Sequence, residues 1–470
     1  MNLKEFFDFI NKKKSKNFFA IINTTLTANP YVSDFPKNYF LKIEGKNNIF
    51  IEFFKSIFIF YLKMSFKLSL FVVHKIIFSI IFNKQIKDKN ILIDTFLISE
   101  QVLEKNEFYD KYFQGLPEVL DKKNIEYSYL LRIFKLGINP ISFFRILNIL
   151  KNEKYLFDFQ IVKFSDLPKI FFQIFIYPFQ TLTLLDKNRQ FNYHIIKDIR
   201  NQSFEAFSRY FVGKNISEMN FKKIISWNEF QVIERSFNFG YKTANGKAEI
   251  IGSQLYINYP TYFNTYIFEE DFKTLSAPHR ILVNGKYYIK NNFLELGVSL
   301  RYKDLFAFKN NLDRSEILLL TPYFKDRTIN LFEICKNTKL QLKLHPTQKA
   351  SEFQIPESFK LVSGNLYDLF KTSEIMITDE SGTAVEGVAV GVSVVIIESQ
   401  NNLTANPLVE FGQGEIWEFA SNREELEIAI QKLKKYRKEN PERVLEISNW
   451  YKNNFFVEPT EENIIKAFDL

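Results

Sequence analysis

The stretch EIMITDESGTAVEGVAVGVSVVIIES, residues 374–399, decides the fold class. It contains a short apolar run, a polar turn at residues 379–383, a segment of small residues and a second apolar run. A strand, a helix and a further strand in this order predict a parallel pair of strands. The turn then lies at the carboxyl end of the first strand, the edge at which α/β sheets bind their ligands.

Apolar runs of similar length occur on both sides of this stretch. They alternate with longer segments of helical pattern, which predicts an α/β protein with largely parallel, doubly wound sheets. Between residue 100 and about residue 225 we expect mainly helices. The clearest strand candidates are ILIDTFLIS (91–99), KAEIIGSQLYI (247–257), HRILVNG (279–285), EILLLTP (316–322), KLQLKLHP (339–346), EIMITDE (374–380) and VSVVIIES (392–399).

A chain of 470 residues is too long for one hydrophobic core, so at least two domains are expected. We place a linker at the Lys- and Asn-rich segment that contains Gly297. The resulting regions are a basic, apolar N-terminal extension (1–89), a first α/β domain (90–290), the linker (291–312), a second α/β domain (313–425) and C-terminal helices (426–470).

Charge and cysteine content narrow the class of protein. The net charge is +8, but the first 90 residues hold fifteen lysines, no arginine and six acidic residues, so the remainder is near neutral. A nearly neutral body argues against a nucleic-acid partner. The single cysteine, Cys335, excludes an internal disulfide and favours the reducing cytoplasm. The first residues do not resemble a secretory signal.

Residues 49–83 are the most apolar part of the chain, but no uncharged run reaches the ~18 residues that a membrane span requires. As a helix, the segment places its charged residues, mostly lysines, on about half of its circumference and leaves a broad apolar face. This pattern suits a helix that lies on an anionic membrane surface. It equally suits a helix whose apolar face packs on its own domain.

The turn after the strand EIMIT is the first candidate site. Its free amide groups and the hydroxyls of Ser381 and Thr383 predict an anion site, with Gly382 allowing close approach of a ligand. Asp379 precedes the turn and Glu386 follows it on the helix. In the alternative interpretation, Thr383 and Glu386 form a capping box and only satisfy the end of the helix.

Two further polar positions follow neighbouring strands. His345-Pro346 ends the run LQLKL, and Ser363-Gly364 lies in the unit between this run and the turn at residues 379–383. The imidazole of His345 can donate to a phosphate or assist a leaving group. The sequence contains no Asp-x-Asp triplet, no Walker loop and no Rossmann GxGxxG, and His and Cys are sparse. We therefore expect no obligatory metal and no bound cofactor.

The order strand-His-Pro followed by strand-Asp-x-Ser-Gly-Thr-x-x-Glu-Gly resembles the donor domain of GT-B glycosyltransferases of bacterial surface polysaccharide synthesis. The stretches SWNEFQVIERSFNFGYKT, EIIGSQLYI and SAPHRILVNG are similar to the middle of capsule and O-antigen proteins. The resemblance covers about residues 90–420 and implies two Rossmann-like domains that face a cleft. It is greatest to sialyl-, Kdo- and nonulosonate transferases, and implies that His345, Ser381 and Thr383 contact the phosphate of a CMP-activated acidic sugar.

The catalytic base is less clearly marked. The acidic motif of some sialyltransferases has no counterpart, because Glu269-Glu270-Asp271 lacks the following glycine. The candidates are Asp94, expected at the end of the first strand, and Glu229 or Glu234, expected on a helix with Trp227. Asp94 has the better expected position, although an aspartate there can also simply form a turn.

These features predict a glycosyltransferase that moves a sugar from a nucleotide donor to a surface-polysaccharide or lipid-linked glycan acceptor. We expect a cytoplasmic protein that can bind peripherally to the inner membrane face. The alternatives are a UDP-sugar-dependent transferase, a sugar-nucleotide epimerase of the same fold, and a non-catalytic scaffold of polysaccharide assembly.

Overall fold

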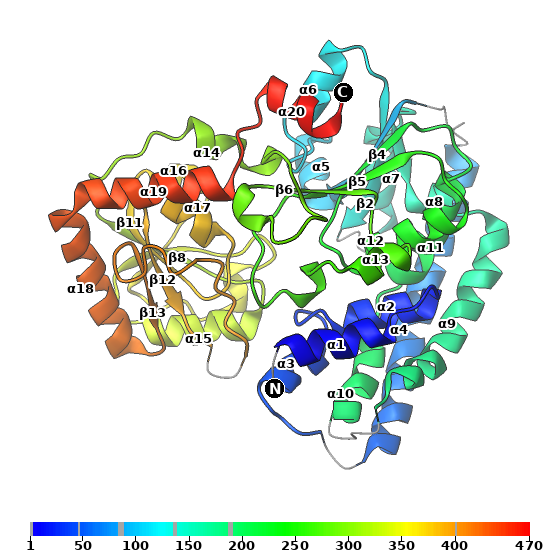
Figure 1. The fold of residues 1–470 in the computed structure, drawn as a ribbon, viewed down its shortest axis with the longest axis horizontal. Helices are drawn as coiled ribbons and strands as arrows, with labels where there is room; N and C mark the ends of the chain where they lie inside the picture. Colours follow the sequence, from blue (N-terminus) through cyan, green and yellow to red (C-terminus); the bar gives the residue numbers. More distant parts are fainter. Residues whose placement is uncertain (1–2, 46–47, 83–88, 135–138, 187–190, 400–401) are drawn as a thin grey trace.

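Two parallel sheets form the body of the protein in the computed structural model (Figure 1). The structure describes residues 3–45, 48–82, 89–134, 139–186, 191–399 and 402–470. Their arrangement confirms the predicted α/β class with two doubly wound domains and an N-terminal helical region.

The first sheet has seven parallel strands in the order β3-β2-β1-β4-β5-β6-β7. Three of them, β2, β3 and β4, lie in the region for which the sequence predicts mainly helices, and β7 lies within the predicted linker. The strands are β1 (Ile91–Ile98), β2 (Tyr127–Phe134), β3 (Tyr155–Phe157), β4 (Lys223–Trp227), β5 (Glu249–Gln254), β6 (Arg280–Val283) and β7 (Glu295–Leu296).

The second sheet repeats this topology with six parallel strands in the order β10-β9-β8-β11-β12-β13. Both orders begin 3-2-1-4-5-6 when the strands of each sheet are counted from its first one, which is the Rossmann order. The strands are β8 (Glu316–Leu320), β9 (Leu340–Lys343), β10 (Phe359–Leu361), β11 (Ser373–Thr378), β12 (Ser393–Ile397) and β13 (Trp417–Ala420).

The α-helices fall into three groups along the chain. Those before the first sheet are α1 (Leu3–Lys13), α2 (Phe18–Thr27), α3 (Asp34–Phe40) and α4 (Ile49–Ile81). Those of the first domain are α5 (Ser99–Lys105), α6 (Leu116–Lys122), α7 (Pro140–Ile149), α8 (Asp158–Ile161), α9 (Leu167–Thr181), α10 (Asn192–Lys197), α11 (Glu205–Ile216), α12 (Val232–Thr243) and α13 (Glu269–Lys273). The next helix, α14 (Lys303–Ala307), belongs with the second sheet, since its Leu305 lies in a core cluster of that sheet. The others are α15 (Lys325–Cys335), α16 (Leu366–Phe370), α17 (Thr383–Ala389), α18 (Arg423–Glu439), α19 (Pro441–Phe455) and α20 (Glu461–Phe468).

Alternation along the strands builds a hydrophobic core on each face of each sheet. Leu92 of β1 belongs to the cluster on one face of the first sheet, whereas Ile91 and Ile93 belong to the cluster on the other. In the second sheet, Met376 and Ile377 of β11 divide in the same way. Strands buried on both faces are therefore nearly continuous apolar runs, which is why they stand out in the sequence.

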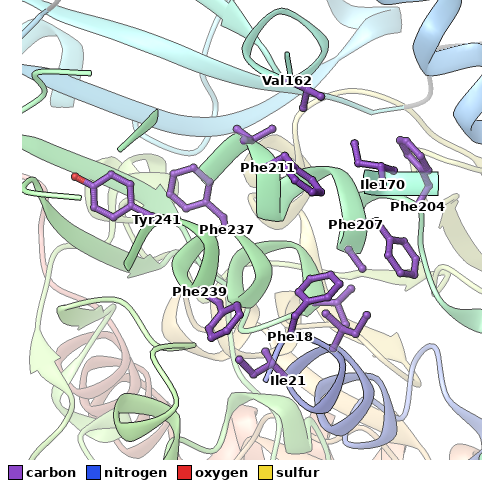
Figure 2. Close-up of a cluster of buried hydrophobic side chains, with 14 of the residues drawn as sticks. Phe18, Ile21, Val162, Ile170, Phe204, Phe207, Phe211, Phe237, Phe239 and Tyr241 are labelled. Carbon is purple, nitrogen blue, oxygen red and sulfur yellow. The ribbon is translucent and has the colours of Figure 1, made fainter. Parts of the chain in front are cut away.

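The N-terminal helices are part of the first domain and not a separate extension. Phe18 and Ile21 of α2 lie in the same buried cluster as Phe207 and Phe211 of α11 and Phe237 of α12 (Figure 2). The sequence predicts a distinct region at residues 1–89 because their composition differs from that of the domain. The structure shows that their apolar side chains complete its core.

The apolar stretch 49–83, described up to residue 82, forms the helix α4, which has one buried and one exposed face. Its side chains at Phe60, Met64 and Phe78 are buried in the domain, while Phe58, Leu62 and Ile80 on the opposite face are exposed. The helix is long and apolar enough to cross a membrane, and only 17% of its most apolar 18-residue window is buried. The structure confirms that one face of the helix packs on its own domain, while binding of the other face to a membrane stays a prediction. Lys84, which the predicted charged face included, lies outside the described residues.

The C-terminal helices return the chain to the first domain. α19 packs against α17 of the second domain, whereas α20 packs against α6. Ile464 and Phe468 of α20 belong to the core cluster that contains Ile93 of β1. The two domains are therefore connected twice, once before β8 and once between α19 and α20.

Two glycines permit the close packing of α11 on α12. A Cβ at Gly213 would lie 2.2 Å from the carbonyl oxygen of Phe237, and one at Gly240 would lie 2.0 Å from that of Tyr210. Both contacts are to backbone atoms, which cannot move aside as a side chain can. Glycine is required at both positions.

We expect Gly240→Ala to lower the free energy of unfolding by about 1–3 kcal/mol, because the methyl group forces α11 and α12 apart. Differential scanning calorimetry would show a lower midpoint for the first domain. Gly387→Ala on α17 is the matched control, since its new Cβ would meet the flexible end of Met376 at 3.3 Å. Equal midpoints for the two variants would contradict the packing argument.

Candidate functional site

Each sheet has one pair of adjacent strands whose following connections run to opposite faces of the sheet. In the first sheet this pair is β1 and β4, and in the second it is β8 and β11. At such a switch point the loops separate at the carboxyl ends of the strands and leave room for a ligand. The loops that follow β4 and β11 are therefore the first places to examine.

The carboxyl edges of the two sheets meet at the turn that follows β11. A Cβ at Gly382 would lie 2.7 Å from the Cβ of Ile257, which belongs to the loop after β5. In the same loop, the hydroxyl of Tyr259 accepts a hydrogen bond from the backbone of Gly382. The predicted phosphate turn thus faces the first domain at contact distance.

The turn itself is not the capping box that was the alternative interpretation. Gly382 is the N-cap of α17, and no side chain caps this end. Ser381 Oγ accepts from the Thr383 amide at 3.2 Å, and the Glu386 carboxylate accepts from the Tyr367 hydroxyl at 2.7 Å. All three residues of the Ser-Gly-Thr turn are half-buried. A bound anion would take the place of Tyr259 and Ser381 as acceptor for the two amides.

Asp379 and Glu380 anchor the start of the turn. Asp379 is buried with its carboxylate 3.7 Å from Nε of Arg327 on α15, and Glu380 pairs with the same guanidinium. Burial raises the pKa of Asp379 to about 6 against the attraction of Arg327. These two carboxylates hold the turn in place through Arg327. Because they are anionic and already paired, they are not suited to bind a phosphate, so the predicted role of Asp379 in the ligand site is not supported.

His345 lies at the same edge of the second sheet, in the loop after β9. Its backbone amide donates to Thr321 Oγ1 at 2.8 Å, and its Nδ1 is 2.7 Å from Thr347 Oγ1. The strand β8 separates β9 from β11. The structure therefore places His345 beside the switch point, one strand away from the Ser381 turn, and Pro346 next to it is exposed.

Ser363 and Gly364 lie in the loop after β10, farther along the same edge. Both are exposed, and the Gly364 carbonyl accepts from Lys343 Nζ at 2.8 Å. Gly364 has a φ of +107°, which favours glycine. This loop is outside the group of residues that the structure brings to the switch point.

A row of aromatic rings connects the His345 loop with the first domain. The ring centroids of His345 and Tyr323 are 5.5 Å apart, those of Tyr323 and Phe324 5.3 Å, and those of Phe324 and Tyr31 6.5 Å. Tyr31 then contacts Tyr262 with a centroid distance of 4.8 Å. The N-terminal segment between α2 and α3 thus contributes a side chain between the two domains, which composition alone did not indicate.

Glu229 is the candidate base that the structure places at the switch point. It follows β4 in a loop, its carboxylate accepts from the side-chain amide of Gln231, and the Tyr262 hydroxyl lies 3.5 Å away. Burial raises the pKa of Glu229 to about 7, and the negative charge of Glu234 adds to the effect while Arg301 opposes it. A carboxyl group with this pKa can accept or donate a proton near neutral pH.

The other two candidate bases are structural. Asp94 lies in the middle of β1 and not at its end, is fully buried, and pairs with Arg209 at 2.5 Å and Arg132 at 3.3 Å. Glu234 pairs with Arg132 at 2.5 Å and accepts from the backbone N–H of Gln231 at 2.9 Å. The placement of Asp94 at a strand end was wrong because the apolar run continues beyond it.

The prediction that Trp227, Glu229 and Glu234 lie on one helix was also wrong. Trp227 ends the strand β4, Glu229 lies in the following loop, and only Glu234 lies on a helix, α12. The segment KIISWNE has a short apolar run between lysines and polar residues, so a five-residue strand is easily missed there.

Arg301 is a site residue that the sequence did not reveal, because it falls in the predicted linker. Its guanidinium lies 5.5 Å from the ring centroid of Tyr112 and 5.7 Å from that of Trp227, and it interacts electrostatically with Glu229 and Glu386. Glu386 is in the second domain, so Arg301 reaches across the boundary. Its side chain is exposed and makes no hydrogen bond or ion pair within the described ranges.

A pocket adjoins Arg301 at the carboxyl end of β1. Its lining includes Phe96, Tyr112, Lys105 and Lys111. Burial lowers the pKa of Lys111, and the positive charges of Lys105 and Arg301 lower it further. These three cations repel one another, so an anionic group in this region would relieve the repulsion.

In the part of the chain that the structure describes, no group of three or more His, Cys, Asp or Glu side chains is placed to hold a metal ion. No family model and no curated protein matches the chain. The comparison with solved structures does find similar folds.

Three of these structures cover most of both chains at low sequence identity. S. aureus MnaA, solved with UDP, has a TM-score of 0.44 and 11% identity over 80% of this chain and 95% of its own. MurG of Acinetobacter baumannii has a TM-score of 0.41 and 9% identity over 81% and 99%. UDP-GlcNAc 2-epimerase from Neisseria meningitidis, bound to UDP-GlcNAc, has a TM-score of 0.40 and 10% identity over 80% and 98%. The strand orders described above establish the fold independently.

We expect Asp94→Asn to lower the free energy of unfolding by about 3–5 kcal/mol, because it leaves Arg209 buried with a weaker partner. Thermal and denaturant unfolding would measure the change. Asp368→Asn is the control, since its ion pair with Lys371 is exposed on both sides and its loss should hardly matter. A stable Asp94→Asn variant would show that the buried pair is dispensable.

Proposed function

We propose that the protein is a glycosyltransferase that binds a nucleotide-activated sugar between its two domains. The observation that carries this proposal is that Arg301 interacts electrostatically both with Glu229, in the loop after β4, and with Glu386, on the helix that follows the Ser381-Gly382-Thr383 turn. A proton acceptor, a cation and a set of hydroxyl and amide donors are the groups that a metal-free sugar transfer needs.

On the donor side, the phosphate binds to the Ser381 and Thr383 hydroxyls and to the amides of the turn. It takes over the hydrogen bond that Gly382 gives to Tyr259. Arg301 and His345 neutralise the charge that develops on the leaving phosphate. Arg301 is suited to this role because its guanidinium, held over the rings of Tyr112 and Trp227, makes no ion pair at contact distance among the described residues.

On the acceptor side, Glu229 acts as the general base. It takes the proton from the acceptor hydroxyl, whose oxygen forms a bond to the anomeric carbon while the bond from that carbon to the phosphate oxygen breaks. The nucleotide leaves with the bonding electrons. The pKa of about 7 allows Glu229 to be ionised before the reaction and protonated after it.

The proposed donor is a CMP-activated acidic sugar such as a nonulosonate or Kdo. A single phosphate needs less charge neutralisation than a diphosphate, which suits a site where Arg301 is the proposed cation and where no group of three or more His, Cys, Asp or Glu side chains among the residues described is placed to hold a metal ion. The cations Lys105, Lys111 and Arg301 suit the carboxylate of an acidic sugar. The proposed acceptor is a surface-polysaccharide or lipid-linked glycan at the cytoplasmic side of the membrane.

A nucleotide panel tests the donor site. We expect CMP to raise the thermal midpoint more than UDP, GDP or TDP, and Ser381→Ala/Thr383→Ala to weaken its binding by about 1–3 kcal/mol in calorimetry. Ser358→Ala is the control, because its hydroxyl lies at the amino end of β10 and bonds only the Lys336 carbonyl among the described residues.

The outcomes of the panel separate the alternatives. Stabilisation by UDP would replace the CMP donor with a UDP-sugar, and interconversion of that sugar without an acceptor would indicate an epimerase. No stabilisation by any nucleotide would leave a non-catalytic scaffold and refute the proposal.

A pH profile tests Glu229. Because only the ionised carboxylate accepts a proton, kcat should fall as the pH drops through about 7. Glu229→Gln should lower kcat by about 10²–10⁴-fold and abolish this limb of the profile. Glu249→Gln, at the amino end of β5, is the matched control. A Glu229→Gln enzyme that keeps both rate and pH dependence would rule out Glu229 as the base.

A further inference from the structure

Two helices of the first domain expose apolar side chains that nothing else in the described chain covers. α4 and α9 pack against each other and lie at the right-hand side of Figure 1, away from the second sheet. We call their exposed surface the α4–α9 face. It includes a helix, α9, that the sequence did not associate with membranes.

On α4 the exposed residues recur every four positions. Phe50, Phe54, Phe58 and Leu62 are each 56–72% exposed. This spacing places them on one side of the helix, opposite the residues that enter the core. The exposed side continues through Val73 and Ile80 toward the end of the helix.

On α9 four phenylalanines are exposed in the same manner. Phe171, Phe172, Phe175 and Phe179 are each 50–61% exposed, while Ile170 and Ile174 on the opposite side are buried in the core. A surface helix normally turns polar residues to water. Here the side away from the core is as apolar as the side within it.

Contacts between the helices make the surface continuous. The Tyr61 hydroxyl donates to the Phe175 carbonyl at 2.7 Å, and their rings stack with centroids 6.2 Å apart. Phe53 and Phe179 approach to a centroid distance of 6.4 Å. An apolar surface of this extent on a single chain marks an interaction site.

The charges on the two helices indicate which kind of partner the α4–α9 face binds. Glu52 is the one acidic residue of α4 and α9, and it is buried beside Arg200. The exposed charged residues are all lysines, namely Lys55, Lys67 and Lys169. Lys169 also pairs with the buried Asp166 at 3.8 Å. Apolar rings with lysines beside them match the acyl chains and anionic headgroups of a bilayer.

Two lysines of α4 bind backbone carbonyls of the domain. Lys63 Nζ donates to the carbonyl of Gln202 at 2.9 Å, and Lys75 Nζ donates to that of Phe159 at 3.1 Å. These bonds and the buried residue Phe60 hold one side of the helix on the domain. Only the opposite side is free to enter lipid.

We infer that the α4–α9 face is a docking surface for an anionic lipid bilayer, with the phenylalanines of α9 inserted beside those of α4. The inference does not depend on the proposed sugar transfer. It concerns a face remote from the Ser381 turn and has its own readout.

Vesicle sedimentation with the full chain tests it. The wild type should bind phosphatidylcholine vesicles that contain phosphatidylglycerol, and bind less as salt rises. Phe172→Glu/Phe175→Glu should weaken binding roughly tenfold or more. Ile428→Glu on α18 is the matched control, since it charges a residue that is 61% exposed on the second domain.

A second measurement reports insertion directly. Phe172→Trp should add tryptophan fluorescence whose emission maximum shifts to the blue when vesicles are present. Lipids with brominated acyl chains should quench this fluorescence. Thermal unfolding confirms that each variant folds. An α9 variant that binds like wild type would overturn the two-helix surface. The inference would also be overturned if the wild type does not bind vesicles and instead forms a dimer without lipid that the α9 substitutions dissociate.

Discussion

A buried network of ion pairs beneath the first switch point holds the site together. Asp94 joins Arg209 and Arg132, Arg132 joins Glu234, and Arg209 joins Asp158 at 2.8 Å. The network thereby ties β1, β2, α8, α11 and α12 to one another. Charges removed from water are costly unless every partner is present, so these elements must form together.

The network also sets the position of Glu229. Glu234 accepts from the Gln231 amide, and the carbonyl of Trp227 accepts from Arg132 at 3.2 Å. The loop between these two points carries Glu229. Because Glu234 is charged and close, it contributes to the raised pKa of Glu229. One residue thus both fixes the loop and adjusts the acidity of the proposed base.

The sequence predicted the sheets where strands are long, apolar and closed by a polar turn, as at β1, β8 and β11. It missed β4 because the apolar pair Ile224-Ile225 is interrupted by Ser226, and it missed Arg301 because a linker-like composition hid a residue that approaches Tyr112 only in the folded chain. Asp94 was misplaced since a carboxylate inside a strand looks like the end of one. Burial and pairing across distant elements are properties of the fold, and no local pattern reports them.

The second crossing of the chain, from α19 to α20, limits how the domains can move. A pair of bodies joined by one segment can twist and swing, but two separate junctions leave mainly rotation about the line through both. Motion of that kind would separate Tyr259 from Gly382 while the junctions stay in place.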